Sequence, residues 1–134
     1  MSFVDQYLTV KNWFMFNSVI LFLFGIGALL MPENLSSSYD LTLEDGGILA
    51  VQNNGAFFLG VGILLWLGRN DGPSDTQKGI MYGMLLIYVL SLILSIRAVM
   101  NDVVNNTGWT DVILNLIIST GWGYLLFVKS DETQ

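Results

Sequence analysis

Polar side chains able to bind or react are few in this chain, and they lie within or beside long apolar runs. Three amides follow one another at Gln52, Asn53 and Asn54, immediately before the apolar stretch "GAFFLGVGILLW". Asp111 and Asn115 are four residues apart, a spacing that places both on one face of a helix. Hydrocarbon offers such groups no hydrogen-bond partner, so they either bond to one another between helices or line a binding pocket.

Proton chemistry has even fewer candidates. Asp111, Arg97 and Tyr88 are the side chains near the apolar runs that could donate or accept a proton in a reaction. The chain contains no histidine and no cysteine, which removes the commonest general base and the usual haem, zinc, copper and thiolate ligands. We therefore predict no metal and no cofactor and a protein that is not an enzyme. A lipid, a quinone or a pigment held by amide or backbone oxygens stays compatible with this composition.

The composition itself indicates a membrane protein. Of 134 residues, 53% are hydrophobic and 12% are charged, whereas soluble domains carry about 25% charged residues. A water-soluble fold of this size could not bury so much apolar surface, so we expect the surrounding solvent to be a lipid bilayer. The net charge of -6 and the absence of a basic cluster argue against nucleic acid as a partner.

Four apolar runs are long enough to cross a bilayer, and they form one domain over residues 1–134. About 20 residues span a hydrocarbon core in helical form, and helices satisfy their own backbone hydrogen bonds there. The polar links between the runs are short, which makes successive helices antiparallel neighbours. The sequence thus predicts an all-α membrane protein with four transmembrane helices in an up-down antiparallel bundle, at residues 12–31, 48–68, 79–99 and 109–128.

The basic residues predict the orientation of this bundle. Four of the five lysines and arginines fall on the side that carries both termini and the link between the second and third spans: Lys11, Arg69, Lys78 and Lys129. Cytoplasmic segments are enriched in lysine and arginine, so we expect an integral multi-pass protein with both termini in the cytoplasm.

With that topology, the polar residues of three spans fall at one depth, in the outer half of the membrane. We expect at least one of Asn53 and Asn54 to point into the bundle and to share a cluster with Asp111 or Asn115, because an inward amide needs a partner there. Arg97 could pair with Asp111 or Asp102, or extend to the interface, and Asp111 could simply begin its helix. The candidate binding cluster comprises Gln52, Asn53, Asn54, Ser95, Arg97, Asp111 and Asn115.

Small residues predict where helices approach closely. The second span contains Gly55, Ala56, Gly60 and Gly62, and Ala56 and Gly60 have the four-residue spacing typical of close helix packing in membranes. We expect all four residues to face a neighbouring helix, so that Gly60→Leu would overpack the bundle.

The segments "GIGALLMPENL" and "QNNGAFFLGVGILLW", followed by two further spans, resemble the DoxX-like family of small four-helix membrane proteins. A sterol-biosynthesis scaffold protein is a more distant look-alike. The resemblance covers nearly the whole chain and implies the four-helix fold, with family functions that range from quinone-linked subunits to scaffolds. An arginine often precedes the glycine of the second helix in such proteins, whereas Asn54 precedes Gly55 here.

Three functional hypotheses follow. The first is a non-enzymatic accessory or scaffold subunit of a larger membrane complex, bound through its apolar helix faces to partner membrane subunits or to further copies of itself. The alternative is a binding or transport module for a small hydrophobic ligand, a quinone or a lipid, in the polar pocket of the outer half. A membrane enzyme is the third hypothesis, limited to the three proton carriers named above.

Overall fold

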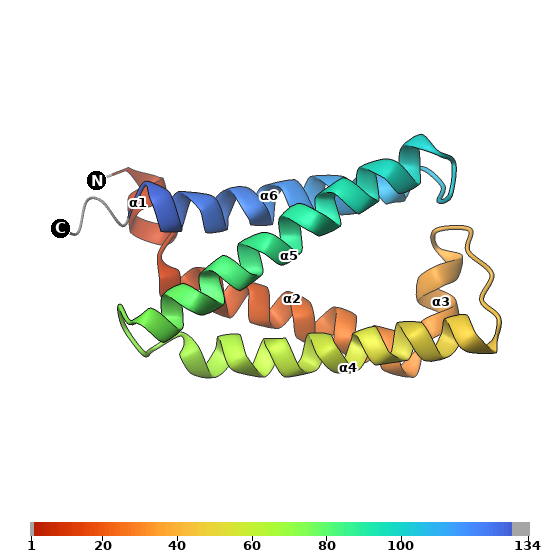
Figure 1. The fold of residues 1–134 in the computed structure, drawn as a ribbon, viewed down its shortest axis with the longest axis horizontal. Helices are drawn as coiled ribbons and strands as arrows, with labels where there is room; N and C mark the ends of the chain where they lie inside the picture. The colour runs from red at the N-terminus through yellow and green to blue at the C-terminus, as the bar shows by residue number, and fades with distance from the viewer. Residues whose placement is uncertain (1, 130–134) are drawn as a thin grey trace.

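The computed structural model describes residues 2–129 as an all-α protein (Figure 1). No strand occurs within these residues. Four helices are long and apolar enough to cross a membrane, and two short helices accompany them. The six helices are α1 (Phe3–Tyr7), α2 (Val10–Leu30), α3 (Pro32–Ser37), α4 (Asp45–Gly68), α5 (Asp75–Met100) and α6 (Gly108–Phe127).

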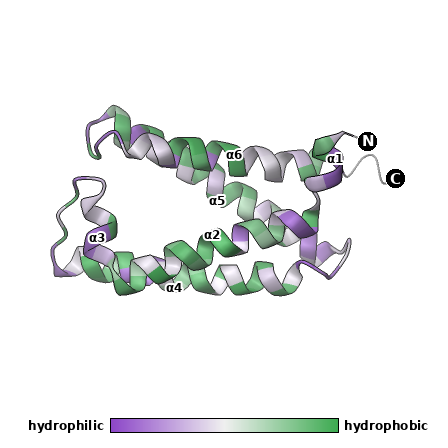
Figure 2. Ribbon diagram, turned by 180° about the vertical axis from the view of Figure 1, so that it is seen from behind, coloured by the Kyte–Doolittle hydropathy of each residue, from purple (hydrophilic) through white to green (hydrophobic). Residues whose placement is uncertain are grey.

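The four spans predicted from the sequence are confirmed. A polar residue precedes the first residue of each long helix. Thr9 accepts a hydrogen bond from the Asn12 amide and begins α2, and Ser74 does the same for α5 through the Gln77 amide. Such side-chain caps satisfy backbone N–H groups that have no partner within the helix. Hydrophilic residues accordingly gather in the loops and at the helix ends, while the helix bodies are apolar (Figure 2).

The bundle is built from two tight helix pairs, α2 with α4 and α5 with α6. We expected all successive helices to be neighbours, but α4 and α5 diverge from the turn that joins them (Figure 1). That turn is short and fixed at its base: Gly72 adopts a φ of 70°, and the Gln77 side chain donates to the Gly68 carbonyl at 3.3 Å. The turn therefore holds α4 and α5 together only at one end.

The two pairs meet at the end of the molecule where α1 and both described chain ends lie (Figure 1). Trp122 of α6 is fully buried there, with its ring 5.3 Å from that of Phe14 on α2. Leu65, Met81 and Ile118 belong to the same core cluster. The hydrophobic core of this protein thus joins the pairs at one end and leaves them apart at the other.

Glycines explain the close approach of α4 to α2. A Cβ at Gly55 would lie 2.8 Å from the carbonyl oxygen of Gly25, closer than real Cβ atoms approach. One at Gly62 would lie 3.2 Å from the Phe22 ring. The Ser18 hydroxyl donates to the Gly62 carbonyl at 2.8 Å, which adds a hydrogen bond between the two helices.

The prediction was wrong for the other two small residues of α4. Ala56 and Gly60 are exposed, and a Cβ at Gly60 would find no atom within 4 Å in the described chain. A helix turns by about 100° per residue, so a face that presents Gly55 and Gly62 to α2 turns Ala56 and Gly60 away from it. Gly60→Leu should consequently not overpack this bundle.

Candidate functional site

A cavity of about 480 Å³ lies between the two helix pairs, on the side of the core away from the chain ends. Volumes of about 300–1,000 Å³ are typical of sites for small molecules. Every long helix contributes to its wall, and most of the lining is apolar, including Phe24, Phe57, Phe58, Met84, Leu94 and Leu114. The cavity exists because α4 and α5 diverge while the core holds α2, α5 and α6 at the opposite end.

The cavity reaches the surface between α4 and α5. Phe57 of α4 is 72% exposed and Leu94 of α5 is 61% exposed, although both line the cavity. Both residues lie inside helices that are long enough to span a membrane. In a bilayer crossed by these helices, the opening would face hydrocarbon rather than water.

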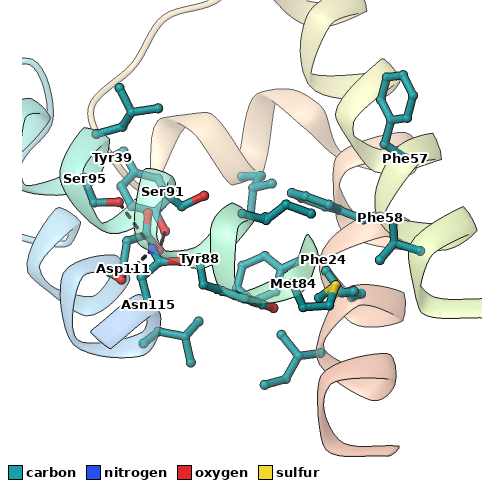
Figure 3. A pocket seen from close by; sticks show the side chains of 17 residues that line it. Phe24, Tyr39, Phe57, Phe58, Met84, Tyr88, Ser91, Ser95, Asp111 and Asn115 are labelled. Carbon is teal, nitrogen blue, oxygen red and sulfur yellow. Dashed lines mark hydrogen bonds between the residues drawn. The ribbon is translucent and has the colours of Figure 1, made fainter. Parts of the chain in front are cut away.

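Polar side chains gather at one end of this cavity, on α5 and α6 (Figure 3). The Asn115 amide nitrogen donates to the Asp111 carbonyl at 2.8 Å and lies 3.4 Å from the Ser95 hydroxyl. Ser91 lies one turn before Ser95 and also lines the cavity. This predicted part of the cluster, Ser95 with Asp111 and Asn115, is brought together by the packing of α5 against α6.

Tyr39 closes the cluster from the loop that follows α3. Its hydroxyl donates to the Asp111 carboxylate at 2.9 Å, across 72 residues of sequence. Asn105 holds the same loop in place, because its amide side chain donates to the Ser38 carbonyl at 3.0 Å and its backbone N–H donates to the Tyr39 carbonyl at 3.3 Å. The two loops at this end are thus linked directly beside the polar end of the cavity.

The Tyr39–Asp111 hydrogen bond makes a testable pH prediction. Burial, followed by the hydrogen bond to Asp111, raises the pKa of Tyr39 from 10.0 to about 12. The hydrogen bond therefore stabilises the fold fully below pH 10.0, and this stabilisation is lost as the pH rises towards about 12. In an absorbance titration, the difference between the wild type and Tyr39→Phe should show tyrosinate forming with a midpoint near pH 12. A midpoint near 10.0, the ordinary value, would show that the phenol is neither buried nor bonded.

The prediction for the consecutive amides was wrong. Asn53 and Asn54 are both exposed on α4, and neither contributes to the cavity. Gly55 faces α2, so Asn54 and Asn53 are rotated from that contact by about 100° and 200°. Gln52, one residue further back along the helix, faces α2, and its amide donates to the Leu29 carbonyl at 3.3 Å. That carbonyl lies in the last turn of α2, where no helical N–H is available to it.

Arg97 also lies apart from the predicted cluster. It is exposed on α5, and the Asp111 carboxylate is bonded to Tyr39 instead. Ser95 faces α6 through Asn115, and two further residues rotate Arg97 by about 200° from that face. Of the alternatives for Arg97, the pair with Asp111 is therefore disfavoured by the rotation of α5, and the exposed position agrees with extension towards the interface.

Tyr39, Tyr88 and Ser91 line the cavity but were not part of the predicted binding cluster, Tyr88 having been considered only as a proton carrier. Tyr88, Ser91 and Ser95 follow one another at the spacing of a single helix face, which is the signal that could have identified them. No local signal marks Tyr39, because its partner is distant in the sequence. Within residues 2–129 we find no group of three acidic side chains arranged to hold a metal ion, and the chain has no histidine or cysteine.

The cavity can bind a small molecule through hydrogen bonds and apolar contacts, and the Asp111 carboxylate is the charged group in its lining. Comparison with models of known protein families, with curated proteins and with solved structures found no match. The cavity is therefore the feature of this protein that best indicates a function.

Proposed function

We propose that this small multi-pass membrane protein binds a small hydrophobic molecule that enters from the bilayer, in the cavity between its two helix pairs. The observation that supports this function best is the cavity itself, with apolar walls, a polar end and an opening between α4 and α5. A lipid or a quinone has the matching shape, an apolar body with a polar group at one end. This proposal makes the chain a binding or transport module rather than an enzyme.

Filling the cavity tests this proposal. Ser91→Trp places a large ring in the cavity, whereas Leu90→Trp adds the same ring at a neighbouring position that is 51% exposed. We expect lipid extraction and native mass spectrometry to find a small hydrophobic molecule bound to the wild type and to Leu90→Trp, and about tenfold less with Ser91→Trp. Equal retention by the two variants, or no bound molecule in any of the three proteins, would contradict the proposal.

An accessory role in a membrane complex or a homo-oligomer is our second proposal. It is favoured by small residues on uncovered faces of α4 and α5: a Cβ at Gly60, Gly79 or Gly83 would meet no atom within 4 Å in the described chain. Gly79 and Gly83 have the four-residue spacing that lets another transmembrane helix approach closely. A protein that co-purifies in fixed ratio, and is lost on Gly83→Leu, would support this role, and a monomer without any partner would oppose it.

We also infer that both termini are cytoplasmic, as the basic residues predict. Lys129 donates to the carbonyls of Asp5 and Leu8, and Arg69 directly follows α4, so these cations lie at the end where the helix pairs meet. Because the chain has no cysteine, a single Thr76→Cys or Asn106→Cys gives an unambiguous labelling site. An impermeant thiol reagent added outside intact cells should label Asn106→Cys and not Thr76→Cys, and the reverse result would invert the topology.

A further inference from the structure

We propose that the ligand of this cavity is a neutral amphiphile with a hydroxyl-bearing head, which bonds to the polar end while its apolar chain lies along the aromatic walls. This inference rests on the proposed function, because it names the chemical class that the same cavity selects. Two observations support it: the polar end is negatively charged, and several donors and acceptors there form no hydrogen bond within the protein.

Charge excludes an anionic head. Among the described residues that line the cavity, Asp111 carries a charge and the others are uncharged, so no lysine or arginine lies beside it. Arg97, the nearest cation in the sequence, is exposed outside the lining. A phosphate or carboxylate would therefore lie beside a carboxylate in a medium of low dielectric constant, where like charges repel strongly.

The unused groups include both acceptors and donors. The second oxygen of the Asp111 carboxylate and the side-chain oxygen of Asn115 accept no hydrogen bond from the described residues. The hydroxyls of Ser91 and Tyr88 also bond to none of them, although Tyr88 is only 7% exposed. Ser91, Asp111 and Asn115 are half-buried, and their free groups face the cavity rather than the packed core. Hydrocarbon in the cavity would offer them no hydrogen bond, so a ligand that both donates and accepts fits this end best.

A hydroxylated neutral head meets that requirement, whereas an ammonium head does not. A hydroxyl donates to Asp111 or Asn115 and accepts from a serine. A protonated amine only donates, and a quaternary ammonium does neither, so that it could interact with Asp111 through charge alone. Figure 3 shows Asp111, Asn115 and Ser95 grouped at one end and the Tyr88 hydroxyl deeper, beside Met84. Tyr88 precedes Ser91 by three residues, about 4.5 Å along the helix, which suits a second oxygen between the head and the chain, such as an ester carbonyl.

Photoreactive lipids test this inference. Three probes would share one diazirine-bearing alkyl chain and end in a glycerol ester, a phosphate monoester or a trimethylammonium group. Each would be added to the full-length protein in phosphatidylcholine nanodiscs, and cross-links would be mapped to the peptides that contain Phe58 and Met84. We expect the glycerol probe to label these peptides about tenfold more than either charged probe, the ratio that one hydrogen bond to a charged group supports.

A matched pair of variants identifies the group responsible. Asp111→Asn removes the charge but keeps an acceptor for Tyr39, so labelling by the phosphate probe should rise towards that of the glycerol probe. Asp102→Asn removes a carboxylate in an exposed turn outside the cavity and should leave the preference unchanged. A preference that is unaffected by Asp111→Asn would overturn the assignment to this residue.

The outcomes separate the two proposals. If all three probes label the cavity equally, the binding function stands and the neutral head is refuted. If the trimethylammonium probe labels best, charge pairing with Asp111 replaces the hydroxyl head. If no probe labels the peptides of the cavity in the wild type, the proposed function fails together with this inference.

Discussion

Replacing Trp122 by alanine should lower the free energy of unfolding by about 3–5 kcal/mol, the range observed when a buried tryptophan is truncated. Trp122 is fully buried and joins α6 to α2 through edge-on contacts with Phe14, at 5.3 Å, and Trp13, at 6.4 Å between ring centroids. In lipid the loss comes mainly from van der Waals packing, because the surrounding acyl chains are as apolar as the side chains removed. Since the core joins the helix pairs at this end, the variant should also separate them.

Unfolding by a denaturing detergent, followed by circular dichroism, measures this effect. Trp109→Ala is the matched control, because Trp109 lies on the same helix and is 43% exposed; we expect it to change the stability by less than about 1 kcal/mol. Trp122→Phe should fall between the two, because the indole nitrogen of Trp122 has no hydrogen-bond partner to lose among the described residues. Equal stability of Trp122→Ala and Trp109→Ala would refute the assignment of this junction as the core.

Gly55→Leu should destabilise the protein by about 3 kcal/mol through overpacking. Its Cβ alone would lie 2.8 Å from the Gly25 carbonyl oxygen and 3.0 Å from the Ala28 Cβ. The first of these atoms belongs to the backbone, so relief requires α2 and α4 to move apart rather than one side chain to rotate. The Ser18–Gly62 hydrogen bond would lengthen as a consequence.

Gly60→Leu on the same helix provides the control, since it adds the same side chain in open space. We expect its stability in detergent to equal that of the wild type within about 0.5 kcal/mol. Both variants lose a helix-interior glycine, so the difference between them isolates the helix contact from backbone propensity. If Gly60→Leu were the more damaging of the two, the face of α4 that packs on α2 would be wrong.

The class of fold could be predicted from the sequence because the information that specifies it is local. Each apolar run carries its own length and its own hydrogen-bonding requirement, so four helical spans follow from residues close to one another in the chain. The same holds for part of the site. Asp111 and Asn115 share a face of α6 through their spacing. Ser95 meets them through the packing of α5 against α6.

The direction in which the remaining polar residues face depends on how the helices pack against one another. The contact of Gly55 with Gly25 sets the rotation of α4, and this rotation turns Asn53 and Asn54 outward and Gln52 towards α2. Three consecutive polar residues carry no periodicity that could have revealed the choice. Arg97 is separated from Asp111 for the same reason, because the rotation of α5 is set by its packing on α6.

The cavity and its closure by Tyr39 depend on contacts between distant segments. Helices α2 and α4 pair tightly while α4 and α5 diverge, a preference that arises from the fit of side chains between helices and not from the length of any link. Tyr39 meets Asp111 across 72 residues, and neither residue's neighbours in the sequence indicate the other. Periodicity and composition record which face of a helix is polar, but the partner of that face is fixed by packing between helices, which the sequence does not encode locally.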